Sequence, residues 1–166
     1  MTPVFQTVVG PADAEKGKKG NCMQAVFASL LDLPLEQVPH FIEEEEDGWF
    51  ETLWNFLKIH GYDYQGYINN PRDVGCWGED DLMRKLQEAE GINGYFYAVV
   101  YSPKYFDAEK YCKGERVNTH AVIVNNKGEI VHDPNPAYKD LEEYPLAKVI
   151  GYRGIKYIYD IRKAVQ

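Results

Sequence analysis

The chain has 166 residues, of which 45% are hydrophobic, so it is long enough for one domain with a substantial core. Its net charge of −8 argues against binding the phosphate backbone of nucleic acids as its main task, because such binding needs clustered Lys and Arg. No stretch approaches membrane-spanning length and no secretory signal opens the chain, so we expect a soluble, cytoplasmic protein with no membrane partner. Cys22, Cys76 and Cys112 are spaced too widely for a disulfide framework or a zinc site, which favours free thiols in a reducing compartment and no metal or other cofactor.

The first part of the chain predicts a short strand followed mostly by helices. Residues 3–9 alternate in the manner of a strand. A helix that is buried on most sides is expected from Cys22 to about Leu33, with Asn21 as its N-cap and Pro34 as its end. The further elements expected before residue 91 are a turn of helix over 34–41, a helix that Asp47 caps and Gly61 ends, a strand over 62–68, a loop over 69–78 and a helix over 79–90 that Gly91 ends.

The second part of the chain changes to the period of two that is typical of strands. Strands are expected over 95–101, 117–124, 129–132, 147–152 and 155–161. The second and third of these form a hairpin around Asn126-Lys127-Gly128. Helices followed by an antiparallel sheet predict a single α+β domain over residues 1–166. The chain also has 13 tyrosines, which either line a groove or fill strand positions.

Cys22 is the first candidate for chemistry, because it stands at the first turn of the expected buried helix. A helix N-terminus carries partial positive charge and unpaired N–H groups, so it favours a thiolate and lowers the thiol pKa. A buried cysteine is by itself more often a small hydrophobic residue than a nucleophile. The catalytic interpretation therefore depends on a base and on a group that orients the base.

His120 supplies that base, and the hairpin supplies its partner. A hairpin loop of two to four residues pairs His120 with a residue between Asp133 and Asn135, so either of these can accept a hydrogen bond from the imidazole. His132 points to the opposite face of its strand, where we expect a surface or supporting role. Cysteine, histidine and aspartate in this chain order indicate a cysteine hydrolase.

These segments resemble a known group of enzymes. Gly-Asn-Cys at a helix start, His-Ala-Val-Ile-Val at a strand start and Ile-Val-His-Asp-Pro at the end of the next strand are similar to the papain-like cysteine peptidase fold. The closest variant is the C39-like peptidase group, together with small phage and bacterial proteins that share a Gly-Asn-Cys-x-Gln-Ala motif. The resemblance covers residues 3–41 and 117–136. It implies a buried N-terminal helix that carries the cysteine, packed on an antiparallel sheet that carries the histidine and the aspartate.

The resemblance also implies a role for each candidate residue. Cys22 matches the nucleophile, His120 the general base and Asp133 the residue that orients the base. Gln6 resembles the glutamine whose side-chain N–H joins the backbone N–H of Cys22 in an oxyanion hole. The stretch between Gln6 and Cys22 is longer than is usual in the family, and Gln24 is the weaker alternative.

The expected function is therefore hydrolysis of a peptide, isopeptide or related amide bond in a peptide or protein substrate. The same triad serves acyl transfer to an amine, and a catalytically silent binding or decoy module on the same fold is the alternative from another class. The side chains that we expect to be incidental or structural are His40, His60, Cys76, Cys112 and the Trp49 and Trp54 stripe.

Overall fold

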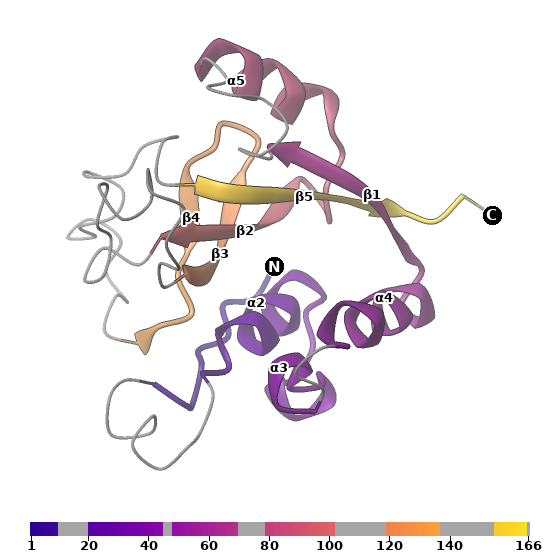
Figure 1. Ribbon diagram of the computed structural model, residues 1–166, viewed down its shortest axis with the longest axis vertical. Coiled ribbons are helices and arrows are strands. Elements are labelled where there is room, and N and C mark those ends of the chain that lie inside the picture. The colour runs from indigo at the N-terminus through magenta and orange to yellow at the C-terminus, as the bar shows by residue number, and fades with distance from the viewer. Residues whose placement is uncertain (10–19, 45–47, 70–78, 102–118, 137–154, 166) are drawn as a thin grey trace.

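The computed structural model describes residues 1–9, 20–44, 48–69, 79–101, 119–136 and 155–165, and it shows an α+β protein (Figure 1). The elements are α2 (Cys22–Leu30), the 3₁₀ turn η1 (Leu35–Gln37), α3 (Phe41–Glu44), α4 (Trp49–Ile59), β1 (Tyr62–Asn69), α5 (Glu79–Glu88), β2 (Tyr95–Tyr101), β3 (Thr119–Asn125), β4 (Ile130–His132) and β5 (Ile155–Lys163). Within these ranges, no helix is long and apolar enough to cross a membrane.

The described strands form one antiparallel sheet in the order β1-β5-β2-β3-β4. The last strand, β5, pairs with both β1 and β2, so the C-terminal strand lies inside the sheet and not at its edge. The α+β class and the antiparallel sheet that the sequence predicts are thus confirmed. Of the two strands expected after residue 146, the one over 155–161 is β5, and the one over 147–152 lies outside the described residues.

Helices cover both faces of the sheet, with α2, α3 and α4 on one side and α5 on the other (Figure 1). Alternate residues of β2 pack against the helices on the two faces, because successive side chains of a strand point to opposite faces. Tyr97 packs with Phe27 of α2, whereas Phe96 and Ala98 pack with Leu82 and Leu86 of α5. The molecule therefore has two hydrophobic cores, and Cys22 lies against the one beneath α2.

Helix α2 ends at Leu30, three residues earlier than the sequence predicts. Asp32 adopts a left-handed backbone with φ 53°, and the Leu33 N–H donates to the Ala28 carbonyl at 2.9 Å. This is the Schellman pattern, which satisfies the last carbonyls of a helix. Pro34 thus follows a helix that has already ended.

The expected strand over residues 3–9 is wrong, because this segment joins no sheet. Single hydrogen bonds join it to α2 on one side and to the residues after β4 on the other. The Val4 N–H donates to Ser29 Oγ at 2.8 Å, and the Gln6 N–H donates to the Pro134 carbonyl at 2.9 Å. The segment therefore ties the cysteine helix to the strand that leads to Asp133.

Most other expected elements are present with small shifts at their ends. Helix α4 begins after Gly48 as its N-cap, while Asp47 lies outside the described residues. It stops before Gly61, which has φ 79° as expected of a helix-ending glycine. The hairpin between β3 and β4 turns through Asn125 to Gly128, where Gly128 has φ 73° and its N–H donates to the Asn125 carbonyl at 3.0 Å.

Candidate active site

Cys22 is the first residue of α2, and its side chain is partly buried against β3. The sulfur has a hydrogen bond with the His120 side chain, and the backbone N–H groups of Ala121 and Met23 also point to it. One of these N–H groups comes from its own helix and the other from the neighbouring strand. The thiol therefore lies where the start of α2 meets the start of β3.

His120 is the second residue of β3 and lies between the thiol and a carboxylate. Its Nε2 lies 2.8 Å from Asp133 Oδ1, and its side chain is 17% exposed. When Nε2–H donates to the carboxylate, the other ring nitrogen, Nδ1, is left to interact with the thiol. The structure thus brings Cys22, His120 and Asp133 into one hydrogen-bonded chain.

Asp133 follows β4, and its side chain is completely buried. Its Oδ1 also accepts a hydrogen bond from the backbone N–H of Asn135 at 2.7 Å. Of the two candidate orienting residues, Asp133 is therefore the one whose carboxylate contacts His120. Asn135 contributes its backbone N–H, which holds the carboxylate in place.

The environment moves the pKa values of the thiol and the imidazole in opposite directions. Burial raises the pKa of Cys22, but the hydrogen bond and the positive charge of His120, with the two backbone N–H groups, outweigh it and leave the pKa below its usual value. Burial lowers the pKa of His120, but its hydrogen bonds with Asp133 and Cys22 and their negative charges outweigh it and raise the pKa to about 10. Both shifts therefore favour the thiolate–imidazolium form of the pair over the neutral form.

Gln6 is buried, and its backbone is held next to Asp133 by the hydrogen bond from its N–H to the Pro134 carbonyl. Its Nε2 donates to the Val8 carbonyl at 3.0 Å, which fixes the orientation of the amide. Its Oε1 is buried and has no hydrogen-bond partner among the residues that the structure describes. One of the two N–H bonds of its amide is thus engaged by Val8.

Gln24, the weaker candidate, has a structural role instead. Its Nε2 donates to the carbonyls of Leu35 and Val38 at 3.1 and 2.7 Å, and its Oε1 accepts from Asn21 Nδ2 at 3.0 Å. Both the nitrogen and the oxygen of this amide thus make hydrogen bonds within the fold. Gln24 fastens the turn η1 to α2 and is not placed as an oxyanion donor.

The sequence predicts Asn21 as the N-cap of α2, but its side chain binds the N-terminal segment instead. It occupies the N-cap position, but its side chain makes no capping hydrogen bond. Its Oδ1 accepts from the backbone N–H groups of Thr7 and Val8 at 3.0 and 2.9 Å, and its Nδ2 donates to Thr7 Oγ1 at 3.1 Å. The residue next to the nucleophile therefore holds the segment that carries Gln6.

His132 is buried, so of the two roles that the sequence allows, at the surface or in support of the site, it does not have the surface one. Its Nε2 lies 2.8 Å from the Val4 carbonyl, and its ring packs edge-on against Phe5 at 5.3 Å. Burial lowers the pKa of His132, although the Val4 carbonyl and the Asp133 charge oppose this effect. It therefore contacts the same N-terminal segment that Asn21 holds, at Val4 rather than at Thr7 and Val8.

The remaining candidates lie away from this chain of residues. His60 ends α4 and packs on Phe56, and Trp54 packs in an aromatic group beside Tyr64. Cys76 and Cys112 lie outside the described residues. In the described ranges, no group of three or more His, Cys, Asp or Glu side chains is arranged to hold a metal ion.

Comparison with known proteins identifies no relative: no protein-family model, no curated protein and no solved structure matches the chain.

Proposed function

We propose that this protein is a cysteine hydrolase that cleaves a peptide, isopeptide or related amide bond. The observation that carries the proposal is the hydrogen-bonded chain from Cys22 through His120 to Asp133. A nucleophile, a base and a buried group that orients the base are the parts that acyl transfer from an amide requires. The pKa shifts add support, because a lowered thiol pKa beside a raised imidazole pKa favours the reactive thiolate.

In the proposed reaction, the thiolate of Cys22 attacks the carbonyl carbon of the substrate, and the carbonyl π electrons move to the oxygen. The oxyanion then re-forms the carbonyl and expels the amine, which takes a proton from the His120 imidazolium. A thioester on Cys22 remains. Water then attacks the thioester while His120 accepts a proton from it, and the free acid leaves as the thiolate is restored. Asp133 holds the imidazole and stabilises its charged form throughout.

The negative oxygen of each tetrahedral intermediate needs hydrogen-bond donors. We assign this role to the backbone N–H of Cys22 and to the Nε2 of Gln6, whose amide orientation is fixed by Val8. The hydrogen bonds of Asn21 and Pro134 to residues 6–8 support this assignment, because they attach Gln6 to both sides of the site. Donors fixed in advance avoid the cost of reorganisation during the reaction.

The same proposal includes a papain-like fold. A cysteine at the start of a buried helix, packed on an antiparallel sheet with the histidine in one strand and the aspartate after the next, is the arrangement that resemblance to the papain-like group implies. The C39-like peptidases remain the variant that the motifs resemble best. On this assignment the substrate is a peptide or a protein.

A digest of a peptide library tests the proposal. Wild-type protein and Cys22→Ala are incubated with the library in isotopically labelled water, and the products are identified by mass spectrometry. We expect cleavage by the wild type alone, with the label in the new carboxyl group. Equal cleavage by both proteins would contradict the role of Cys22. Products that contain an added amine in place of the labelled acid would assign the site to acyl transfer instead.

A further inference from the structure

A row of side chains crosses the sheet from the thiol toward β1, on the face where α2 lies, and beyond Ala121 the row is only partly buried. The Ala121 N–H points to the Cys22 sulfur, and Ala121 pairs with Val99, which in turn pairs with Tyr157. These residues belong to, or pack against, the same core as Cys22, so they share one face of the sheet. Neighbouring strands lie about 4.8 Å apart, so Tyr157 lies ~10 Å from Ala121.

Beyond Tyr157 the row continues onto β1 through aromatic rings. The Tyr67 ring lies 5.0 Å from that of Tyr157 and 6.0 Å from that of Tyr64. Tyr64 and Tyr67 share this face although they are three positions apart, because the strand has an irregularity between Tyr64 and Gly66, where Gly66 has φ 141°. Tyr67 is 42% exposed, whereas Tyr157, Tyr64 and Val99 are partly buried. We call Val99, Tyr157, Tyr67 and Tyr64 the tyrosine track.

The tyrosine track is polar at its hydroxyl groups but carries no charge. Tyr67 has side-chain hydrogen bonds with Tyr64 and Tyr159, and burial together with the neighbouring phenols raises the pKa of both partners. Tyr159 stacks on Tyr97 at 4.6 Å, and the charge of Cys22 contributes to the raised pKa of Tyr97. The phenols thus form one connected group, whose member Tyr97 is near enough to Cys22 to be affected by its charge.

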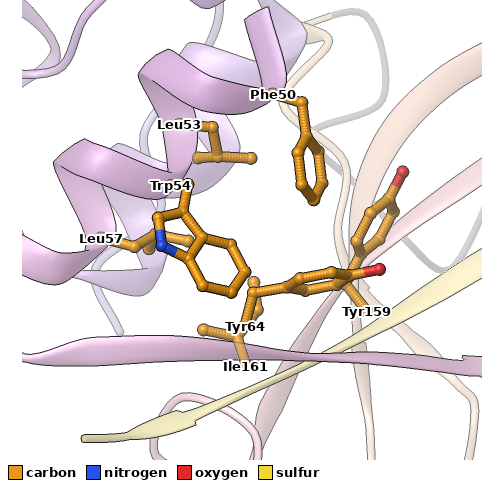
Figure 2. A pocket seen from close by; sticks show the side chains of 7 residues that line it. All are labelled: Phe50, Leu53, Trp54, Leu57, Tyr64, Tyr159 and Ile161. Atoms are coloured by element: carbon orange, nitrogen blue, oxygen red, sulfur yellow. The ribbon is translucent and has the colours of Figure 1, made fainter.

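The far end of the tyrosine track opens into an apolar hollow between α4 and strands β1 and β5 (Figure 2). The residues that line it are Phe50, Leu53, Trp54, Leu57, Tyr64, Tyr159 and Ile161. Figure 2 shows the rings of Phe50, Trp54 and Tyr64 around its opening, with the Tyr159 ring behind them. The hollow has a cavity volume of about 10 Å³, room for no more than about one water molecule. The partly exposed rings of the tyrosine track, Tyr67 above all, are therefore the groups that can contact an aromatic side chain, through offset and edge-on ring contacts.

We infer that the tyrosine track binds an extended segment of the substrate and selects an aromatic residue three or four positions from the scissile carbonyl. The residue at the scissile bond lies beside Val99, where no aromatic ring of the track is available, because the Ala121 side chain is buried. Tyr157 lies one strand beyond Val99 and Tyr67 two strands beyond it, at ~5 and ~10 Å. An extended peptide advances ~3.3–3.6 Å per residue, so its third and fourth residues lie ~7 and ~10 Å beyond the first, between Tyr157 and Tyr67. The inference rests on the proposed function, because it takes Cys22 as the reacting group.

Peptidyl chloromethyl ketones that alkylate Cys22 test this inference without knowledge of the natural substrate. The probes are acetylated tetra-alanine ketones in which Phe replaces each alanine in turn, counted from the reactive carbonyl. The labelling rate at Cys22 is followed by peptide mass spectrometry. We expect Phe at the third or fourth position to raise the rate about fivefold to tenfold over the all-alanine probe, and Phe at the first position to give no comparable gain.

Variants of the tyrosine track locate the effect. Tyr67→Ala and Tyr157→Ala should each remove most of the gain, whereas Tyr67→Phe, which keeps the ring, should retain most of it. Tyr95→Ala is the matched control, since Tyr95 is also a partly buried tyrosine but lies four residues along β2 from Val99. The ratio of two probes on one variant cancels any change in thiol reactivity.

The outcomes separate this inference from the proposed function. If iodoacetamide alkylates Cys22 rapidly but no Phe position gives a gain, or if the gain survives in Tyr67→Ala and Tyr157→Ala, the tyrosine track does not select the substrate. A gain confined to the first position would also overturn the inference. If iodoacetamide reacts with Cys22 no faster than with an ordinary thiol, the proposed function fails and this inference fails with it.

Discussion

At the scale of single residues, the charge state of His120 depends on the carboxylate behind it. Asp133 is completely buried, and its Oδ1 is held both by His120 and by the Asn135 N–H. A buried carboxylate favours a positive imidazole strongly, because little water screens the two charges. The pKa of about 10 for His120 follows from this partner and from the thiolate on the other side.

Asp133→Asn should therefore change the pH dependence of turnover. The neutral amide still fills the site but no longer stabilises the imidazolium, so the pKa of His120 falls. The imidazolium is then lost at lower pH, and the basic limb of the profile should move to lower pH. Turnover at its optimum should fall on the order of a hundredfold, which is within the range for general acid–base groups.

The matched control for this change is Asn135→Ala, which keeps the backbone N–H that holds Asp133. It should lower turnover far less and leave the basic limb in place. The opposite pattern, with an unmoved profile in Asp133→Asn and lost activity in Asn135→Ala, would show that the asparagine orients the histidine.

At the scale of elements, Asn21 joins the start of α2 to the N-terminal segment. Asn21→Ala would leave the N–H groups of Thr7 and Val8, which are partly buried, without their acceptor and should lower the free energy of unfolding by about 2–3 kcal/mol. Thr7→Val removes only the hydroxyl that accepts from Asn21 Nδ2 and should cost about 1 kcal/mol. Urea unfolding of both variants measures the difference. Equal losses would mean that the two backbone hydrogen bonds do not hold the segment.

The turn before β2 offers a second test at this scale. Gly91 and Gly94 both have left-handed backbones, with φ 61° and 82°. A Cβ at Gly91 would lie 2.5 Å from the Tyr95 carbonyl oxygen, whereas one at Gly94 would meet nothing within 4 Å. Gly94→Ala should cost about 1–2 kcal/mol for the backbone alone, and Gly91→Ala should cost roughly 1–3 kcal/mol more because the chain must shift. Equal costs in thermal or urea unfolding would show that the turn relaxes freely.

At the scale of the whole molecule, the sequence predicts the features that depend on residues close together in the chain. The hairpin follows from its Asn-Lys-Gly turn, and the shortness of its loop is enough to limit the partner of His120 to Asp133 through Asn135. The C-terminal end of α4 follows in the same way from Gly61, and β2 follows from its alternation, whereas the N-cap of α4 is Gly48 and not the predicted Asp47.

Long-range placement could not be read from local pattern. The position of β5 between β1 and β2 depends on pairing between residues 55 (Val100 and Ile155) to 101 (Tyr62 and Lys163) positions apart, which leaves no signal in the strand itself. Residues 3–9 alternate like a strand, yet their hydrogen bonds go to side chains and single carbonyls of α2 and the end of β4. For the same reason Asn21 was predicted as a helix cap, although its side chain serves a distant segment.

The central claim is that folding brings a thiol from the first helix and an imidazole from β3 together as an ion pair. The most direct test is the pH dependence of Cys22 alkylation by iodoacetamide, resolved from Cys76 and Cys112 by peptide mass spectrometry, in the wild type and in His120→Ala. His120 lowers the pKa of Cys22 against the effect of burial, so the wild-type rate should rise at a lower pH than that of a free thiol. Without His120 only burial and the backbone N–H groups remain, and the rise should move toward or above the free-thiol pKa of ~8.5. An ordinary thiol profile in the wild type, unchanged by His120→Ala, would contradict the claim.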